Sequence, residues 1–263
     1  MLASLLLILA PCGEPLGVAP RVALLDADSY GMQLLATAGA ETEPQLDVTA
    51  DVKWSVSPGD LASVDETGWL TPRRAGEGKV VVERDGERRE TALKIGPARN
   101  TPPSFRLDAM SALSKGGCNQ GACHGALSGR GGFRLSLRGD LPDPDWFSIT
   151  RKQTGRRIDA GSPANSLLLA KPLGEIAHEG GKRFARGSAP HRRLLSWLSA
   201  GALDDRSEAP RVAKLEITPR QRVIRSSGRK QQLAVVATLS TGETRDVTRE
   251  ACYEWNDPAR ASV

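Results

Sequence analysis

Short apolar segments separated by turn signals fill the first third of the chain. The alternation of apolar and polar residues from Val52 to Val56 is typical of a strand that buries one face. Dipeptides such as Pro58-Gly59 and Asp85-Gly86 lie between these segments and favour tight turns. The spacing predicts an all-β, Ig-like antiparallel sandwich over residues 20–97. The expected strands cover residues 22–25, 32–36, 52–56, 79–83 and 91–95.

A helical pattern, with apolar residues three or four positions apart, follows the predicted sandwich. Ser104 is placed to cap a helix whose apolar face lies within residues 105–113 and which ends at Gly116. Pro190 favours the first turn of a second helix, rich in leucine and tryptophan, which ends at Gly201. We therefore expect a mainly α region between two β-rich parts.

The chain contains an internal repeat with a constant offset of 199 residues. The tripeptide Asp47-Val48-Thr49 recurs as Asp246-Val247-Thr248, and Trp54 corresponds to the aromatic Tyr253. Two further matches obey the same offset: Gln33-Leu34 with Gln232-Leu233, and Ala62-Ser63-Val64 with Ala261-Ser262-Val263. The repeat predicts a second sandwich over residues 212–263 that is incomplete, because the last strands of the first copy have no counterpart. We expect the sequence to be a fragment of a longer protein.

Composition and charge exclude several classes of function. A net charge of +5 over 263 residues is too small for an obligate polyanion binder. The basic residues occur in scattered pairs, among them Arg156-Arg157 and Arg192-Arg193, without interleaved aromatic residues. This distribution predicts a solvated basic surface and no nucleic-acid partner.

The apolar segment MLASLLLILA at the start has the length of the hydrophobic region of a signal peptide. We expect residues 1–19 to be an export signal, with Cys12 as an alternative site for a lipid anchor. No later run of apolar residues is long enough to span a membrane. The sequence thus predicts an exported protein of the periplasm or cell surface, with no membrane span beyond the signal segment.

The motif with the clearest chemistry is Cys118-Asn119-Gln120-Gly121-Ala122-Cys123-His124. Two thiols followed directly by a histidine form the order that attaches haem covalently, although four residues lie between the cysteines where haem-attachment motifs usually have two. A disulfide between Cys118 and Cys123 is a second interpretation. A zinc site formed by Cys118, Cys123, His124 and His178 is a third.

Two family resemblances narrow these alternatives. The segments DVT, ASVDETGWLTP and RRAGEGKVVV resemble the bacterial Ig-like group 2 family. The segments PSFRLDAMSALSKGGCNQGACHGALSGRGGF, RRIDAGSPANSLLLAKP, HEGGKRF and HRRLLSWLSAGA resemble the cytochrome c-like region of large planctomycete-type proteins with domains of unknown function. The resemblance implies a multidomain chain, with a mainly α cytochrome c-like domain at residues 104–205. It also implies haem c bound to Cys118 and Cys123, with His124 as the proximal iron ligand.

A second axial ligand is expected from the loop before the last helix, which contains no methionine. His178 lies there beside two glycines that let the backbone approach a flat ring, and we assign it as the distal ligand. His191 is the alternative, although its polar position in the last helix favours an exposed or capping role. Lys182 and Arg183 are candidates to pair with haem propionates.

The hypothesis from the sequence is therefore an exported c-type haem protein that transfers single electrons, with the electron-transfer role favoured over an enzymatic one and the latter left open. Its partner would be a redox protein of unknown identity, while the Ig-like modules act as spacers or contact cell-surface or polysaccharide material. The alternative is a non-redox adhesion or scaffold protein with a disulfide-stapled helical insert. Asp143 and Asp145 flank Pro144, and we expect them in a solvated loop and not as a catalytic dyad.

Overall fold

The fold is described from a computed structural model of the chain. It describes residues 15–20, 22–39, 45–205, 207–224, 227–257, 259 and 262. The chain divides into two compact units. The sandwich unit combines residues 1–100 with 215–237, and the helical unit combines residues 101–214 with 238–263. Cys12 and most of the expected signal segment lie outside the described residues.

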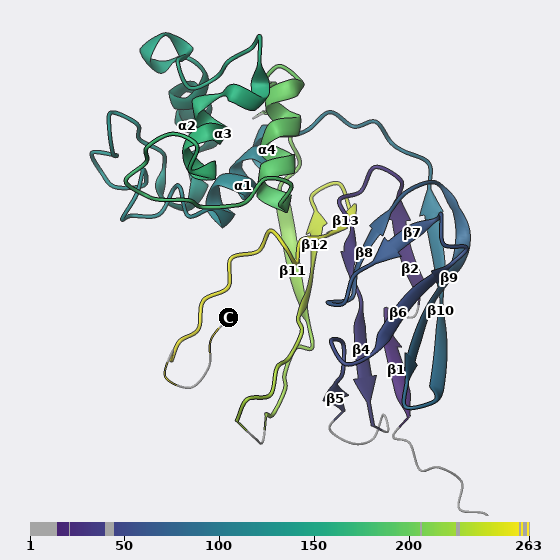
Figure 1. Ribbon diagram of the computed structural model, residues 1–263. Coiled ribbons are helices and arrows are strands. Elements are labelled where there is room, and N and C mark those ends of the chain that lie inside the picture. Colours follow the sequence, from purple (N-terminus) through teal and green to yellow (C-terminus); the bar gives the residue numbers. More distant parts are fainter. Residues whose placement is uncertain are drawn as a thin grey trace, which may run out of the picture. The chain divides into compact units, whose positions relative to one another are not determined.

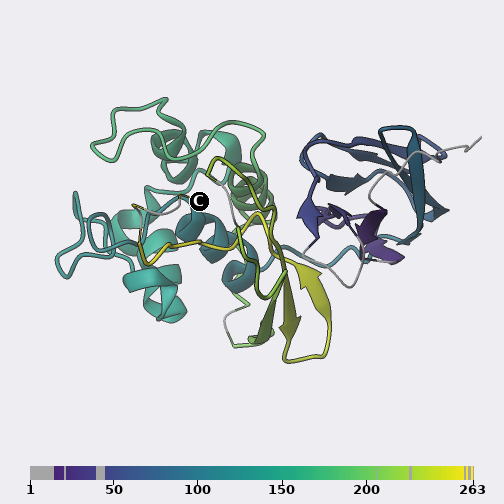
Figure 2. The same cartoon turned by 90° about the horizontal axis from the view of Figure 1, so that it is seen from below.

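The described residues between positions 16 and 96 of the sandwich unit form ten strands (Figures 1 and 2). They are β1 (Leu16–Ala19), β2 (Val22–Asp26), β3 (Met32–Gln33), β4 (Leu35–Ala38), β5 (Leu46–Asp47), β6 (Lys53–Ser57), β7 (Ala62–Val64), β8 (Trp69–Pro72), β9 (Gly76–Arg84) and β10 (Glu87–Gly96). The sheet orders are β2-β10-β9-β6, β1-β4-β5 and β3-β8-β7. Each expected strand overlaps an observed one, and β1 shows that the sheet structure begins within the residues assigned to the signal segment.

Strand β10 shows why the alternating pattern predicted strands here. Thr91, Leu93 and Ile95 are buried, while the residues between them are exposed. Leu93 and Ile95 join a core of apolar side chains from several strands, namely Leu34, Leu61, Ala62, Leu70 and Val80. Burial of one face of each sheet against the other removes this apolar surface from water, which is the main stabilising contribution in such a sandwich.

The internal repeat is visible in matching hydrogen bonds. The backbone N–H of Thr49 donates to Asp47 Oδ1 at 2.9 Å, and Thr248 donates to Asp246 Oδ1 at 2.9 Å. Each Asp therefore fixes the turn that follows a strand. The aromatic residue five positions later closes the same turn in both copies. Trp54 Nε1 donates to the Thr49 carbonyl at 2.9 Å, and the hydroxyl of Tyr253 donates to the Thr248 carbonyl at 2.9 Å.

The second copy contributes one described sheet, with order β11-β12-β13. Its strands are β11 (Val212–Thr218), β12 (Ala234–Leu239) and β13 (Thr244–Asp246). In the repeat register this sheet corresponds to β1-β4-β5, so both the order and the turn contacts of the first copy recur. The division between the two compact units runs through β11 and β12.

The described residues of the helical unit form four α-helices joined by long irregular segments. They are α1 (Met110–Lys115), α2 (Pro142–Thr150), α3 (Leu167–Leu173) and α4 (Ala189–Ser199). A π-helical turn (Phe105–Ala109) leads into α1, and 3-10 turns cover Leu137–Gly139, Lys152–Gly155 and Pro163–Asn165. Ser104 caps the first of these elements as predicted, because its Oγ accepts from Leu107 N at 2.9 Å.

The expectation of a mainly α cytochrome c-like domain is wrong. The described chain is β-rich, with four sheets and only four short α-helices, the longest of 11 residues. Glycines at positive φ interrupt both long connections of the helical unit, for instance Gly117 and Gly132 before α2 and Gly174 and Gly181 before α4. Glycine in this conformation ends a helix, so the chain there runs as ordered loops.

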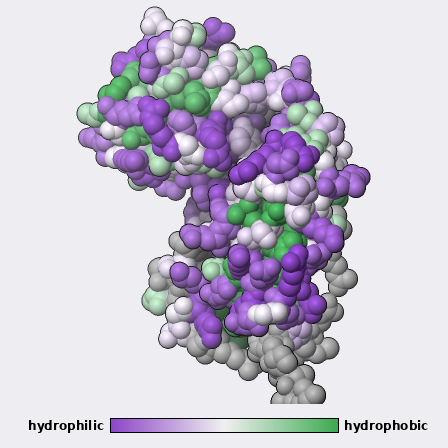
Figure 3. Space-filling view, turned by 45° about the vertical axis from the view of Figure 1, so that its right-hand side comes forward, coloured by the Kyte–Doolittle hydropathy of each residue, from purple (hydrophilic) through white to green (hydrophobic). Residues whose placement is uncertain are grey.

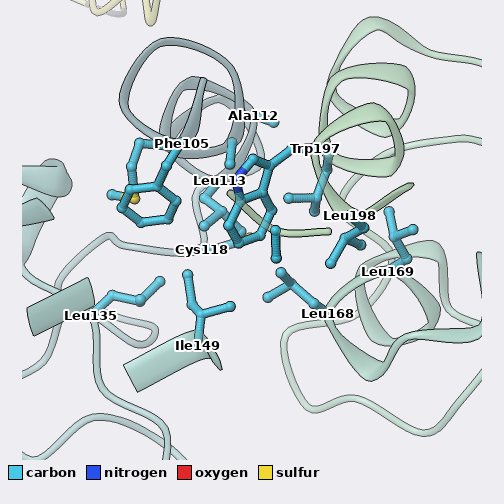
Figure 4. Close-up of a cluster of buried hydrophobic side chains, with 14 of the residues drawn as sticks. Phe105, Ala112, Leu113, Cys118, Leu135, Ile149, Leu168, Leu169, Trp197 and Leu198 are labelled. Atoms are coloured by element: carbon cyan, nitrogen blue, oxygen red, sulfur yellow. The ribbon is translucent and has the colours of Figure 1, made fainter. Parts of the chain in front are cut away.

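The core of the helical unit lies between α1, α3 and α4 (Figure 4). Trp197 and Phe105 are fully buried, with ring centroids 5.3 Å apart. Trp197 Nε1 donates to the Leu203 carbonyl at 3.0 Å, which satisfies the one polar atom of this side chain. Met110 is also buried, as expected for a core residue.

Hydrophilic side chains cover most of the face drawn in Figure 3, with smaller apolar patches between them. The described part of the chain has no helix of the length and hydrophobicity that crossing a membrane requires.

Candidate functional site

The first cysteine of the motif is fixed at the end of the first helix. Gly116 and Gly117 end α1, and Cys118 N donates to the Leu113 carbonyl at 2.9 Å. Cys118 is consequently buried among apolar side chains, beside Leu113 and Trp197 in Figure 4. Burial raises the pKa of the Cys118 thiol to about 11, so this sulfur remains protonated at neutral pH.

The longer spacing between the cysteines is absorbed by a closed loop. His124 N donates to the Cys118 carbonyl at 3.0 Å, and Cys123 N donates to the Gln120 carbonyl at 2.9 Å. Gly125 has no space for a side chain, since an added Cβ would lie 2.1 Å from the Asn119 carbonyl oxygen. The loop therefore returns to its starting point and brings His124 beside the backbone of Cys118.

Cys118 and Cys123 are free thiols, and Cys123 is half-buried. The disulfide that the sequence left open is not formed. Among the residues that the structure describes, no group of three or more Cys, His, Asp or Glu side chains is placed to hold a metal ion. The four-ligand zinc site that the sequence also left open is thus not assembled.

His124 is held by the backbone of a neighbouring loop. Its Nδ1 lies 3.1 Å from the Phe133 carbonyl oxygen, and the ring centroids of His124 and Phe133 are 4.6 Å apart. A carbonyl oxygen only accepts hydrogen bonds, so Nδ1 carries the proton and the lone pair of Nε2 is directed elsewhere. Burial lowers the pKa of His124 below its usual value, which keeps the ring neutral at pH 7.

His178 is held in the same way by its own loop. Its Nδ1 lies 3.0 Å from the Gly181 carbonyl oxygen, which again leaves the Nε2 lone pair uncommitted. Gly180 passes close under the ring, because a Cβ at this position would lie 2.9 Å from His178 Cε1. Gly180 thus lies against the imidazole of His178 itself, and the expected approach of this backbone to the flat ring of a haem stays a prediction.

The structure brings His124 and His178 together. Their ring centroids are 6.2 Å apart and the ring planes differ by only 15°. The two rings are stacked, and a separation of this size is short enough for imidazoles with metal–nitrogen bonds of about 2.0 Å to reach one ion after a change in ring orientation. A hydrogen bond from the other ring nitrogen to a carbonyl is the usual outer support of a metal-binding histidine. Both rings have this support.

Arg183 connects the two loops that carry the histidines. Its Nε donates to the Gly116 carbonyl at 2.6 Å, and its Nη1 donates to the Gly180 carbonyl at 3.4 Å. The sequence suggested Arg183 and Lys182 as propionate partners. Arg183 instead uses these donors on the backbone of the site, whereas Lys182 is exposed.

His191 has a different environment from that of His178. It is buried in α4, and its Nδ1 accepts from Gly187 N at 3.2 Å. The capping role expected for His191 is therefore present, but the exposed position is not. Burial and the neighbouring Arg186 lower its pKa.

Two buried charged residues near the site were not identified from the sequence. Arg157, expected on a solvated surface, is only 6% exposed and contacts the loop that holds His124. Asp145, expected in a solvated loop, is 1% exposed at the start of α2 and accepts from Ser136 N at 2.5 Å and Ser136 Oγ at 2.6 Å. Burial raises the pKa of Asp145. The sequence does not show that either residue is buried, because each lies near other charged residues that are exposed.

No family model matches this chain, and no curated protein matches it either.

Proposed function

We propose that this chain binds haem c covalently and transfers single electrons. The observation that carries the proposal is the pair of near-parallel imidazoles, His124 and His178, with centroids 6.2 Å apart and both Nδ1 atoms facing carbonyl oxygens. The proposal concerns the cofactor and the ligands, not the fold.

The donor set fits this cofactor chemically. Cys118 and Cys123 are free, and each thiol would add its S–H across one vinyl group, forming a thioether without a separate oxidant. His124 and His178 would supply the two axial nitrogens. The bound iron would supply one-electron redox chemistry, while the chain sets the reduction potential through ligand type and burial. Two imidazoles favour a lower potential than an imidazole with a thioether ligand.

Export and partners form the second part of the proposal. Haem attachment and the apolar N-terminal segment support a location in the periplasm or at the cell surface, with the Ig-like copies as spacers or adhesion modules. The partner would be a redox protein. The alternative function, a non-redox adhesion or scaffold protein, would need a disulfide between Cys118 and Cys123, and the free thiols favour the haem proposal over it.

The attachment is tested by producing the chain in a host with a cytochrome maturation system. We expect haem that survives acid-acetone extraction and gives a pyridine haemochrome spectrum. The double variant Cys118→Ala/Cys123→Ala should lose all covalently bound haem. A colourless wild-type protein, or a double variant with an unchanged spectrum, contradicts the proposal.

The axial ligands are tested by a matched pair of histidine variants. His178→Ala should retain covalent haem but change ferric absorption from low spin towards high spin, with carbon monoxide binding to the ferrous form. His191→Ala, which removes a buried histidine outside the site, should leave the spin state unchanged. The reverse outcome would exchange the two roles and contradict the assignment of His178.

A further inference from the structure

We infer that Arg157 is a positioning residue for His124, and that its charge raises the reduction potential of the bound iron. The inference rests on the proposed function, since it names a determinant of that same centre. Three sets of contacts support the inference. The first anchors Arg157, the second joins it to Gly132 and Phe133, and the third joins Phe133 to His124.

The first set of hydrogen bonds fixes the backbone and the side chain of Arg157. Its backbone carbonyl accepts from Leu168 N at 3.1 Å, which connects it to α3. Its Nη1 donates to the Ser148 carbonyl at 3.0 Å and the Lys152 carbonyl at 3.2 Å. A guanidinium offers several donors in a rigid plane, so these bonds leave the side chain one orientation.

The second contact joins Arg157 to the loop beside His124. Arg157 Nη2 donates to the Gly132 carbonyl at 3.1 Å, and the guanidinium carbon lies 4.4 Å from the centre of the Phe133 ring. This arrangement combines a charge-assisted hydrogen bond with a cation–π contact. Gly132 has a φ of +71°, a backbone conformation that strains residues with a side chain, so glycine is favoured where this loop meets Arg157.

The third contact is that of Phe133 with His124. The Phe133 carbonyl accepts the proton of His124 Nδ1, and the Phe133 ring packs on the imidazole. Arg157 therefore sets both the hydrogen bond that orients His124 and the ring that limits its rotation. Support of this kind fixes the orientation and basicity of a metal-binding histidine.

The charge of Arg157 adds an electrostatic effect. Among the described residues no acidic side chain pairs with Arg157, although the residue is only 6% exposed. Its partners are neutral: three backbone carbonyls and Gln153 Oε1, which accepts from Nη2 at 2.9 Å. An uncompensated buried cation disfavours the ferric state, which carries one more positive charge than the ferrous state. The reduction potential should therefore fall when this charge is removed.

The experiment uses holoprotein and three variants. Arg157→Met removes the charge and the hydrogen bonds, Arg157→Lys retains the charge but not the planar donors, and Arg156→Met removes an exposed arginine next in sequence. Redox titration measures the potential, electron paramagnetic resonance of the ferric state reports the orientation of the axial ligands, and circular dichroism checks folding.

We expect Arg157→Met to lower the potential and broaden the low-spin resonance. Arg157→Lys should broaden the resonance but keep the potential closer to that of the wild type. Arg156→Met should change neither property. An unchanged potential and resonance in folded Arg157→Met would overturn the inference, as would an equal shift in Arg156→Met. Should Arg157→Met not fold, Phe133→Leu removes the ring that contacts both Arg157 and His124 but keeps the backbone carbonyl, and an unchanged resonance in that variant would equally overturn the inference.

A separate measurement distinguishes failure of this inference from failure of the proposed function. Wild-type protein without covalent haem would contradict the proposed function. The positioning role is then read from nuclear magnetic resonance of the haem-free protein, in which the Nδ1 proton of His124 should exchange slowly. Arg157→Met should speed this exchange by about tenfold or more, while Arg156→Met should not. Equal exchange in all three proteins would overturn the positioning role.

Discussion

The two compact units differ in their charged residues: both have ion pairs at the surface, but among the described residues the helical unit alone has a buried ionic cluster. In the sandwich unit, ion pairs lie at the surface: the pair Arg74–Asp60, at 2.8 Å, has side chains that are 49% and 66% exposed. In the helical unit, Arg193 is 1% exposed and bonds to Asp108 at 2.6 Å and to Glu250. Arg245 approaches Asp108 at 3.2 Å and completes a buried ionic cluster.

This difference follows from the backbone of each unit. Strands of the sandwich satisfy most of one another's N–H and C=O groups, so its core needs few polar side chains, such as Thr49, and no buried ion pair among the described residues. The long loops of the helical unit have no such ladder, and buried side chains satisfy their backbone groups instead. Arg157 serves the carbonyls of Gly132 and Ser148, and Asp145 serves the N–H of Ser136. The comparison indicates that ordered loops, and with them the histidine pair, depend on buried polar side chains.

The largest expected effect on stability comes from a substitution in the buried ionic cluster of Asp108, Arg193, Arg245 and Glu250. Asp108→Asn leaves the Arg193 guanidinium buried with its charge less compensated, and breaking one partner of a buried pair costs about 3–5 kcal/mol. We expect a loss of that size in the free energy of unfolding of the helical unit, measured by segment-resolved hydrogen exchange. Asp60→Asn in the exposed pair is the control and should cause no measurable change. If the two variants lost the same free energy of unfolding, buried and exposed ion pairs would contribute equally and the contrast between the two units would be wrong.

An intermediate effect is expected for a buried hydroxyl in the sandwich. Thr49 Oγ1 accepts from the buried Ala36 N at 2.9 Å, and Thr49→Val leaves that N–H without its acceptor at nearly unchanged shape. We expect a cost of about 1–3 kcal/mol in urea unfolding followed by tryptophan fluorescence. Thr67→Val is the control, because Thr67 makes its hydroxyl bond to Asp65 at the exposed surface, and it should change stability by less than about 0.5 kcal/mol. A neutral Thr49→Val would show that the sandwich tolerates a lost buried hydrogen bond.

The smallest effect concerns the dependence of stability on pH in the haem-free protein. Burial lowers the pKa of His191 below 6.5 in the folded state, so the unfolded state binds more protons as the pH falls through that value. The contribution of His191 to stability should be constant above pH 6.5 and decrease below it, by at most about 1.4 kcal/mol per pH unit. His191→Gln should flatten this dependence, measured as the change in thermal midpoint between pH 7 and pH 5. A steeper dependence in the variant would contradict the direction of the pKa shift.

The sequence by itself determined the elements with a strong period. The alternation around Val52–Val56 predicted β6, the offset of 199 residues predicted equivalent turns after β5 and β13, and Ser104 and Pro190 predicted the starts of two helical segments. These features depend on residues close in sequence, so local patterns are sufficient. The order Cys118, Cys123, His124 was likewise readable as a candidate site.

Only the tertiary structure decided how the loops fold and what supports the site. The sequence predicted a mainly α domain, because isolated helical patterns do not show how many glycines between them adopt positive φ. It assigned Arg157 and Arg193 to the surface, because burial of a charge depends on partners 25 to 85 residues away, such as Gly132 and Asp108. The approach of His178 to within 6.2 Å of His124 also joins residues distant in sequence. Such contacts depend on the packing of whole loops, which no local pattern encodes.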